Sequence, residues 1–535
     1  MNSLLSRKAV AALVAAVITG CLATAALSQA PQRDERPDRP AAASQPATSP
    51  SPAAADSEAS HRERPERPAS TRRLPSEVVT DHAVDLPGRT LRFKATAGSL
   101  PINDAEGTLQ AEIAYVAYAA VVPDGTVRPV TFVFNGGPGA ASAYLHLGAL
   151  GPWRLPFDHV SPSAPPSVVA NADTWLDFTD LVFIDPVGTG YSHLVASSDN
   201  VRRRFWSVDG DAESLAVFIR KWLEKAGRQT SAKFIVGESY GGFRSPKVAK
   251  RLQANEGVGI SGLVLVSPVL DFGWRGQGAH SPLSWAVRLP SMAATVLEAK
   301  GAFDRDALRD VEHYAAGEYL LDLLRGERDT AAVERISARV ASYTGLDPTL
   351  VRRLAGRVDM ATFQRERNRQ RGLVGSAYDP TVTGFDPYPT SASSRYEDPM
   401  LGALAAPLTS AMSALYQHEL HWQIDAPYHL LDREVSSGWN WGGGRTPPEV
   451  VDDLRSVLAG DRQLRVLIAH GASDLVTPYF ENQLIIDQLP AFGPAERLKL
   501  VVYGGGHMFY SRDASRHAFR DEVERLFRVA REPTE

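Results

Sequence analysis

The sequence is poor in cysteine, since Cys21 is the only one among 535 residues. A disulfide framework and a thiolate zinc site each need several cysteines, so both are excluded. Neither sign of charge dominates, because 57 Lys and Arg stand against 62 Asp and Glu, a net charge of −5. The chain lacks the basic surplus of nucleic-acid-binding proteins, and nucleic acid is not an expected partner.

The apolar run near the N-terminus is too short for a membrane span. Arg7 and Lys8 precede it, and it covers residues 9–18, fewer than the roughly 20 residues that cross a bilayer. A short apolar run behind basic residues is typical of a removable export signal. We therefore expect a signal peptide over residues 1–30 and an exported protein, in the periplasm or cell envelope or secreted.

Two processing sites compete at the end of this signal. Residues 18–21 resemble the lipobox of bacterial lipoproteins, whose signal would end before Cys21 and whose cysteine would be acylated. Residues 28–30 resemble a small-residue signal-peptidase site. The sequence leaves both open, so membrane anchoring through a lipid on Cys21 stays an alternative.

A linker is expected next. Residues 31–73 consist largely of Pro, Ala, Ser, Arg and Glu, with almost no bulky apolar side chain. Such a segment cannot bury enough surface to offset the entropy lost on ordering, and we predict that it is disordered.

Buried strands are indicated from residue 74 onwards. Two segments of alternating strand-forming residues, 90–96 and 111–119, predict an antiparallel pair, and residues 212–226 predict a helix with a broad apolar face. Short apolar runs bounded by Gly, Pro or Asp predict parallel strands at residues 130–134, 181–184, 234–236, 263–266, 464–469 and 498–503. The expected fold is α/β, with a mostly parallel central sheet and helices on both faces.

One long interval breaks the alternation of strands and helices. Between residues 268 and 464 no convincing buried strand occurs, and apolar stripes at helical spacing predict mainly helix. We interpret residues 276–454 as a helical cap inserted into a catalytic domain formed by residues 74–275 and 455–535.

A strand that runs into Gly237-Glu238-Ser239-Tyr240-Gly241 predicts a nucleophile elbow. Glycines on either side permit the sharp strand-to-helix turn that exposes the hydroxyl of Ser239. The helix that follows directs backbone N–H groups at developing negative charge. Ser239 is therefore the candidate nucleophile.

A serine nucleophile needs a base and a carboxylate that orients the base. Asp474 follows the strand at 464–469, and His507 follows the strand at 498–503. The order Ser239, Asp474, His507 is that of α/β hydrolases. His470 and Asp185 are the competing histidine and acid; His470 precedes the acid and Asp185 precedes the serine, so we interpret both as structural.

The glycine-rich loop at residues 135–139 follows the strand at 130–134 and predicts a second element of an acyl-transfer site. The N–H groups of Gly137 and Tyr240 would form an oxyanion hole. A phosphate-binding role is disfavoured because the Lys and Ser/Thr of a P-loop are missing.

No metal site is expected. His418 and His421 are three residues apart with Glu419 between them, which is not the H-E-x-x-H spacing that lets two imidazoles share a zinc ion. We predict a reaction without metal or other cofactor.

Together these motifs resemble the serine carboxypeptidase family, peptidase family S10, and within it the bacterial branch with an α/β-hydrolase fold and a long cap insertion. The resemblance covers roughly residues 80–530. It rests on the motifs at residues 134–139, 184–192, 237–242, 471–474 and 506–508.

The resemblance implies a role for each matching residue. Ser239, Asp474 and His507 would form the triad. The side chain of Asn135 and the N–H of Gly136 would bind the terminal carboxylate of the substrate. Residues implied beside them are Glu238, Met508 and Trp153. Glu238 would act as a protonated donor, because a carboxylate next to an incoming carboxylate repels it.

The chain departs from the family's pattern at several positions. Ala149 replaces a glutamate that joins the carboxylate-binding network in eukaryotic members, which weakens the expectation of an acidic pH optimum and of strictness for a free C-terminus. The proline usual after His-Met-x is also missing, and Tyr510 stands there.

The predicted function is that of an exported serine carboxypeptidase-like hydrolase, which releases C-terminal residues through an acyl-enzyme and acts on a peptide or small acyl substrate. An esterase or acyltransferase on the same machinery is the first alternative, which the departure at Ala149 keeps open. A catalytically silent, envelope-tethered binding protein is the second.

Overall fold

The computed structural model describes residues 73–530, except 124, 158, 159, 197, 275–280, 393, 394 and 445. The predicted signal peptide, Cys21 and the predicted linker up to residue 72 lie outside the described residues. Within the described part of the chain, no helix has the length and apolarity to cross a membrane.

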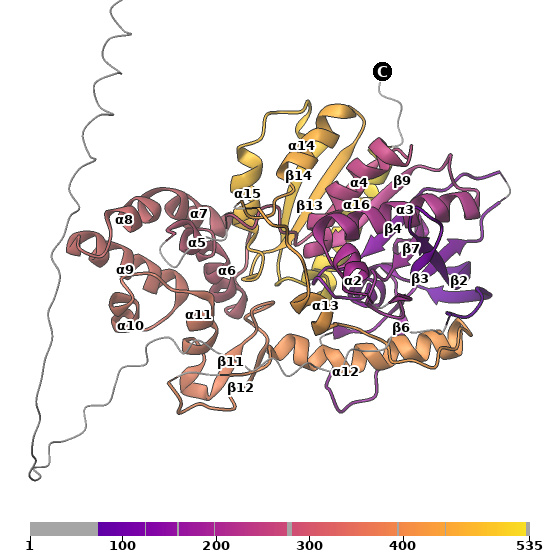
Figure 1. The fold of residues 1–535 in the computed structure, drawn as a ribbon. Helices are drawn as coiled ribbons and strands as arrows, with labels where there is room; N and C mark the ends of the chain where they lie inside the picture. The colour runs from indigo at the N-terminus through magenta and orange to yellow at the C-terminus, as the bar shows by residue number, and fades with distance from the viewer. Residues whose placement is uncertain are drawn as a thin grey trace, which may run out of the picture. The chain divides into compact units, whose positions relative to one another are not determined.

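Ten strands of the described chain form one sheet, in the order β1-β2-β3-β7-β4-β9-β10-β13-β14, with β8 on β3 (Figure 1). The pairs from β1 to β7 are antiparallel, and those from β7 to β14 are parallel. The strands are β1 (Val78–Leu86), β2 (Arg89–Asn103), β3 (Leu109–Ala120), β4 (Val130–Phe134), β7 (Asp180–Ile184), β8 (His193–Leu194), β9 (Lys233–Glu238), β10 (Gly262–Val266), β13 (Arg465–Gly471) and β14 (Leu498–Tyr503). The six predicted parallel strands and the antiparallel pair are all present, and the predicted fold class is confirmed.

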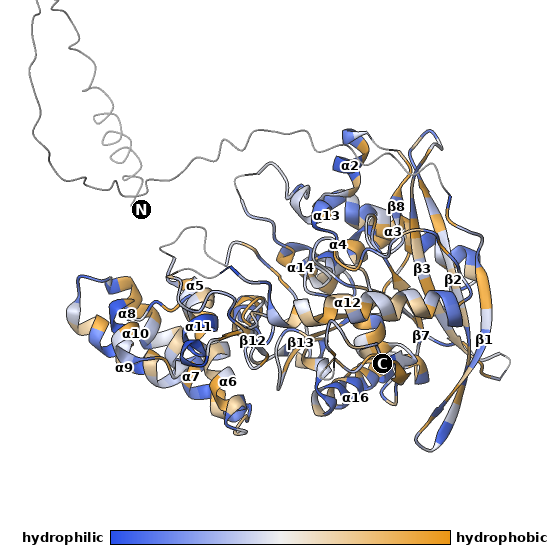
Figure 2. Ribbon diagram, turned by 90° about the horizontal axis from the view of Figure 1, so that it is seen from below, coloured by the Kyte–Doolittle hydropathy of each residue, from blue (hydrophilic) through white to orange (hydrophobic). Residues whose placement is uncertain are grey.

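Helices cover both faces of this sheet. Strand side chains alternate between two buried clusters, so Phe132 joins one face and Val133 the other. The first face is packed by α3 (Val208–Ala226), α4 (Tyr240–Asn255) and α14 (Val451–Gly460), and the second by α12 (Pro399–Ala414) and α16 (Asp513–Val529). Outer helices such as α9 (Thr330–Thr344) and α16 carry hydrophilic and hydrophobic residues together, as helices with one face on a core should (Figure 2).

The helix predicted at residues 212–226 is the main part of α3. Ser207 caps its N-terminus, because the side-chain oxygen accepts a hydrogen bond from the N–H of Gly210. Gly227 ends it in the left-handed conformation, with φ of 64°.

The region between β10 and β13 falls into two parts. Its first part is a helical cluster with its own apolar core, which also contacts Leu475 and Tyr479 of the catalytic region. The helices of this cluster are α5 (Leu283–Ala286), α6 (Leu289–Ala299), α7 (Arg309–Tyr314), α8 (Leu320–Arg325), α9 (Thr330–Thr344), α10 (Pro348–Arg353) and α11 (Met360–Glu366).

The second part packs into the cores of the sheet. It contains the hairpin β11 (Leu373–Gly375) and β12 (Thr383–Phe385), α12 and the short helix α13 (Arg433–Ser437). The predicted boundary at residue 455 falls inside α14, because Leu454 and Val457 lie on one apolar face of a continuous helix that begins at Val451. The division into a catalytic domain and a cap stays a prediction.

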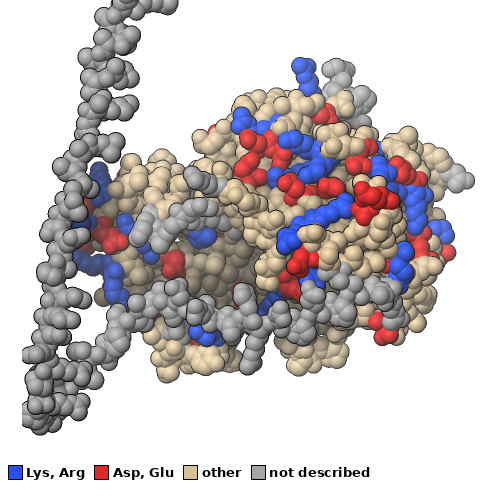
Figure 3. All heavy atoms as spheres, in the orientation of Figure 1, with Lys and Arg blue, Asp and Glu red and all other residues tan. Residues whose placement is uncertain are grey.

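Acidic and basic side chains are interspersed on the face of the molecule shown in Figure 3, rather than gathered by sign. This distribution agrees with the small net charge of the sequence.

Candidate active site

Ser239 lies between β9 and α4, with φ of 61° and ψ of −122°, a strained conformation for a residue with a side chain. The glycines around it have no room for a side chain. A Cβ on Gly237 would lie 2.1 Å from the carbonyl oxygen of Gly241, and a Cβ on Gly241 would lie 2.8 Å from that of Phe134. The sequence therefore folds into the sharp turn that the elbow motif predicts.

His507 and Asp474 follow neighbouring parallel strands, β14 and β13, and meet at the same edge of the sheet. The Nδ1 atom of His507 lies 2.7 Å from Oδ2 of Asp474. Asp474 is fully buried, and its Oδ1 accepts hydrogen bonds from the N–H groups of Val476 and Thr477 at 2.8 and 2.9 Å. These bonds fix the carboxylate against the imidazole.

A cavity of about 140 Å³ brings the predicted residues together. Asp474 stands behind His507, and the other eight predicted site residues line the cavity: Asn135, Gly136, Gly137, Glu238, Ser239, Tyr240, His507 and Met508. Their catalytic and binding roles stay predictions.

A larger cavity, of about 330 Å³, lies elsewhere and is lined in part by Tyr191, Trp206 and His429. Neither Ser239 nor His507 contributes to it. The predicted chemistry belongs to the smaller cavity, because the candidate nucleophile Ser239 and the candidate base His507 both line it.

The glycine-rich loop lies directly against the elbow. A Cβ on Gly136 would lie 2.5 Å from the nitrogen of Tyr240, and Gly137 has φ of +96°. Within the described residues, the N–H groups of Gly137 and Tyr240 have no hydrogen-bond acceptor. Both residues line the cavity, so these two donors remain for a ligand.

Glu238 is a buried carboxyl with two hydrogen-bond donors. Its Oε2 atom lies 2.5 Å from Nδ2 of Asn135 and 2.9 Å from the hydroxyl of Tyr510. Among the described residues no cation pairs with it. Burial raises the pKa of Glu238 to about 7, although nearby His507 and the two hydrogen bonds oppose this shift.

The amide of Asn135 has a fixed orientation. Its Oδ1 atom accepts a hydrogen bond from the N–H of Leu145 at 3.0 Å, so Nδ2 must face Glu238. One N–H of this amide is therefore committed to the carboxyl of Glu238, and the other is available to the cavity that Asn135 lines.

Sequence reasoning missed three tyrosines at the site. Tyr144 and Tyr378 line the cavity, and Tyr510 contacts Glu238 behind it. The ring of Tyr378 meets that of His507 edge-on, with centroids 5.2 Å apart. Only position 510 had a signal, as a departure from the family's pattern; nothing in the sequence singles out Tyr378, which comes from the inserted region.

The competing residues lie away from the cavity. His470 is fully buried, and its Nε2 lies 2.7 Å from Nδ2 of Asn482. Asp185 accepts hydrogen bonds from the N–H of Ser142 and the hydroxyl of Tyr428. Trp153, which the resemblance implied at the pocket, instead packs its ring against aromatic neighbours, and so that expectation is wrong.

No metal site is visible in the described chain. His418 and His421 join no group of three or more His, Cys, Asp or Glu side chains that could hold a metal ion, and neither does any other described residue.

Among the comparisons with known proteins, the family match covers the motifs at residues 134–139, 184–192 and 237–242. The family profile described as serine carboxypeptidase matches residues 87–274. Serine carboxypeptidase-like 36 of Arabidopsis thaliana is 26% identical over 230 residues, which cover 39% of this chain and 44% of the relative. The pheromone-processing carboxypeptidase kex1 of Aspergillus clavatus is 33% identical over 121 residues, 22% of this chain and 18% of the relative. The matches thus span less than half of these relatives.

A solved structure extends the likeness in fold. The crystal structure of Kex1Δp, a prohormone-processing carboxypeptidase from Saccharomyces cerevisiae, matches with a TM-score of 0.51 and 16% identity, over 81% of this chain and 91% of that one. Residues 87–274, which hold the loop at Asn135 and the elbow at Ser239, therefore relate this chain to the serine carboxypeptidases of peptidase family S10.

Proposed function

We propose that this protein is an exported serine carboxypeptidase-like hydrolase of the bacterial branch, which releases C-terminal residues from peptides. One observation carries the proposal. Ser239 and His507 line one cavity together with a buried carboxyl and amide, Glu238 and Asn135, and Asp474 contacts His507 from behind. The first set suits acyl transfer, and the second suits recognition of a terminal carboxylate.

The reaction follows from the first set. The hydroxyl oxygen of Ser239 attacks the last peptide carbonyl while His507 takes its proton, and Asp474 stabilises the imidazolium. The N–H groups of Gly137 and Tyr240 stabilise the oxyanion. His507 then gives the proton to the leaving amine, which breaks the C–N bond and leaves an acyl-enzyme on Ser239. Water, deprotonated by His507, hydrolyses that ester.

The second set favours a carboxylate ligand over other groups. Asn135 donates to Glu238 through one N–H, and below its pKa of about 7 the carboxyl of Glu238 has its own O–H. A buried O–H needs an acceptor, and the carboxylate of a peptide supplies one. Because none of the cavity's described lining residues is Lys or Arg, hydrogen bonds rather than an ion pair would hold the substrate's terminus.

The cavity favours a substrate with an uncharged side chain next to the scissile bond. Besides the residues already assigned, its lining is largely apolar, with Val269, Phe272, Leu401, Leu431 and Val476. A charged side chain placed there would lose its hydration without a partner.

Export and anchoring belong to the same proposal and rest on the sequence before residue 73. If Cys21 carries a lipid, Cys21→Ser releases the protein from the membrane fraction of the producing cells. If it does not, wild type and Cys21→Ser fractionate alike.

The proposed reaction is tested with the purified protein and its Ser239→Ala variant. Blocked dipeptides with a free C-terminus, their C-terminal amides and their simple esters are compared between pH 4 and pH 8. We expect the free acid to be cleaved much faster than the amide, and Ser239→Ala to be inactive on all three. Cleavage of esters alone would contradict the proposed peptidase activity and favour the esterase alternative. Full activity in Ser239→Ala would contradict the role of Ser239 as nucleophile.

A further inference from the structure

Tyr510 contacts the carboxyl of Glu238 from outside the cavity lining. It lies in the short 3-10 helix Phe509–Ser511, three residues after His507, and is fully buried. Its hydroxyl is 2.9 Å from Oε2 and 3.1 Å from Oε1 of Glu238. It does not line the cavity, but its hydroxyl contacts Glu238, which does, so we place its effect on the substrate at Glu238.

The hydroxyl of Tyr510 is a donor under all ordinary conditions. Burial, together with the neighbouring Glu238, holds the pKa of Tyr510 well above its usual value, and so the phenol stays neutral. A neutral phenol next to both oxygens of a carboxyl donates its proton to them and limits the rotation of the group.

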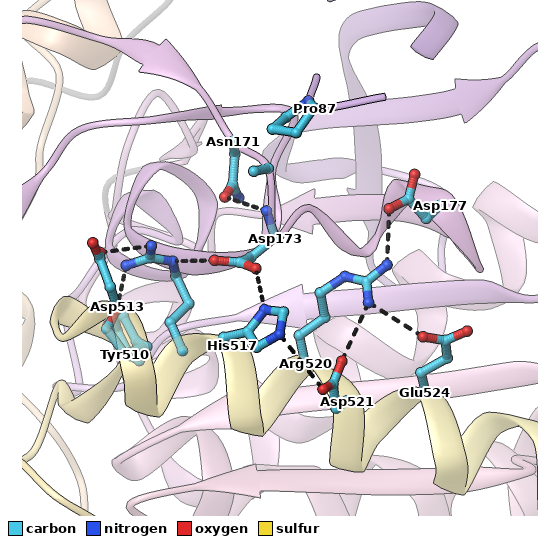
Figure 4. A network of polar contacts seen from close by, with 12 residues as sticks. Pro87, Asn171, Asp173, Asp177, Tyr510, Asp513, His517, Arg520, Asp521 and Glu524 are labelled. Carbon is cyan, nitrogen blue, oxygen red and sulfur yellow. Dashed lines mark hydrogen bonds and ion pairs between the residues drawn. The ribbon is translucent and has the colours of Figure 1, made fainter. Parts of the chain in front are cut away.

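The position of Tyr510 is itself fixed. Its backbone oxygen accepts a hydrogen bond from Nη1 of Arg516 at 3.3 Å. Arg516 is held in turn by Asp173 at 3.0 Å and Asp513 at 2.7 Å. Figure 4 shows Tyr510 and Asp513 at the start of α16, with Asp173 facing them from the neighbouring loop.

The ring of Tyr510 lies against the segment that carries Ala149. A Cβ on Gly148 would come within 2.8 Å of its Cε2 atom. The two departures from the family's pattern, at positions 149 and 510, are therefore neighbours in space. The part of the site predicted to bind a carboxylate therefore contains one acid, Glu238, and the phenol of Tyr510 beside it.

We propose that Tyr510 is a positioning residue, whose hydroxyl holds the carboxyl of Glu238 in the orientation that binds the terminal carboxylate of the substrate. This inference rests on the proposed function. Tyr510 touches neither the substrate nor the reacting atoms, and it contributes to the choice of free acid over ester.

If Tyr510 only supported the fold, its loss would not alter the pH dependence of free-acid cleavage. A positioning role beside Glu238 predicts that it does. The hydrogen bond from Tyr510 lowers the pKa of Glu238 against the effect of burial, so its loss raises that pKa further. The other titratable groups that face Glu238 are His507, Asp474, Tyr144 and Tyr378. In Tyr510→Phe, the decline of free-acid cleavage with rising pH moves to higher pH.

The test compares the kcat/KM of a free-acid dipeptide with that of its ester in the full chain. Both substrates use Ser239 and His507, so their ratio cancels effects on the triad and on the fraction of active enzyme. In Tyr510→Phe we expect the ratio at pH 5 to fall roughly fivefold, through the KM of the acid, because one buried hydrogen bond is lost. In Glu238→Gln/Tyr510→Phe the ratio should equal that of Glu238→Gln.

Tyr503→Phe is the matched control. Tyr503 is also buried and near the C-terminal helix, but its hydroxyl has no hydrogen-bond partner among the described residues. An unchanged ratio in Tyr510→Phe, or an equal fall in Tyr503→Phe, overturns the inference. If Tyr510→Phe does not fold, Arg516→Lys keeps the phenol but loosens it, and an unchanged ratio there also overturns the inference.

The two proposals fail separately. A wild-type protein without preference for the free acid contradicts the proposed function before any variant is compared. A wild-type protein with that preference, and a Tyr510→Phe variant that retains it with the same pH profile, contradicts only the role of Tyr510.

Discussion

The carboxylate of Asp379 lies 3.2 Å from the amide nitrogen of Gly506, so the inserted region directly holds the residue that precedes His507. Arg512 joins Asp379, at 2.9 Å, to Glu298 of α6, at 2.8 Å. Glu298 accepts a hydrogen bond from the N–H of Gly505 at 2.6 Å. Two acids of the inserted region thus fix the loop that carries the candidate base.

Replacement of Asp379 by Asn should therefore slow the reaction without changing its specificity. The variant loses the ion pair with Arg512, and a small displacement of His507 costs about tenfold or more in kcat. Because the base serves every substrate, free acid and ester should be affected equally, with KM nearly constant. Steady-state kinetics on both substrates measure this.

Asp306→Asn is a suitable control for Asp379→Asn. Asp306 also lies in the inserted region and pairs with Arg309 at 2.8 Å, but both side chains are exposed. An exposed pair contributes little to stability, so this variant should behave as wild type. A loss of activity in both variants, or one confined to KM, would contradict a specific role for Asp379.

Two further variants separate the candidate His507–Asp474 pair from the competing histidine, His470. In Asp474→Asn the side chain still accepts from the N–H groups of Val476 and Thr477, but an amide faces Nδ1 of His507 and favours the wrong tautomer. We expect kcat to fall by about 10⁴, with little change in the melting temperature.

His470→Ala should show the opposite pattern. Its hydrogen bond to Asn482 is buried and distant from the cavity, so the free energy of unfolding should fall by about 1–3 kcal/mol while kcat stays within a few-fold. Denaturant unfolding and kinetics on the same preparations decide the matter. Loss of catalysis in His470→Ala, with an active Asp474→Asn, would contradict the pairing of His507 with Asp474 and favour His470 as the base.

The parallel strands could be predicted because each is a continuous apolar run, as a strand buried on both faces must be. Residues 130–134 were predicted with the bounds of β4. Strand β9 is longer than predicted, since it extends through Gly237 to Glu238, a glycine and an acid that no apolar pattern includes. The two-part packing of the inserted region was not predictable, because α12 has apolar residues whose partners lie far away in sequence.

The residues of the candidate site also divide into those that the sequence predicts and those that it does not. Asn135, Gly136 and Ser239 lie in local motifs in which glycines permit close backbone approach, and such motifs can be recognised in one sequence. Tyr378 reaches the site through tertiary packing alone, and the one signal at Tyr510 is its departure from the family's pattern. A tyrosine in a loop has no local pattern that distinguishes a role beside a carboxyl from ordinary burial.

Gly136→Ala tests how tightly the loop fits the elbow. The new Cβ would lie 2.5 Å from the nitrogen of Tyr240 and 2.6 Å from the carbonyl oxygen of Glu238, both backbone atoms that cannot turn aside. We expect kcat to fall by about 10²–10³, as with loss of an oxyanion donor, and stability to fall by about 1–3 kcal/mol. Kinetics on an ester and thermal unfolding measure these effects.

Gly402→Ala controls for the substitution itself. Gly402 lies in α12 with open space where a Cβ would stand, so alanine should leave activity unchanged and raise helix stability by up to about 1 kcal/mol. A Gly136→Ala variant as active as Gly402→Ala would show that the loop does not depend on its contact with Tyr240.

The ratio of free-acid to ester cleavage should depend on Glu238. Burial raises the pKa of Glu238 to about 7, so the neutral carboxyl predominates below that pH and can donate to a substrate carboxylate. Above it two negative charges meet, and we expect the ratio to fall with rising pH, approaching tenfold per pH unit. Glu238→Gln should remove this dependence. A wild-type ratio that stays flat between pH 5 and pH 8.5 would exclude Glu238 from carboxylate recognition.

The same shift should be visible in folding stability. The carboxyl of Glu238 has a pKa of about 7 when folded against its usual 4.5, so the folded state binds a proton that the unfolded state has lost between these values. Its contribution is fully present below pH 4.5 and is lost as the pH rises through 7, on the order of 3 kcal/mol for a buried group. Glu238→Gln lacks this titration. Denaturant unfolding measures the free energy of unfolding of both proteins at pH 4.5 and 8. Between these values wild type should lose stability relative to Glu238→Gln. An equal change in both proteins would mean that Glu238 stays ionised or solvated.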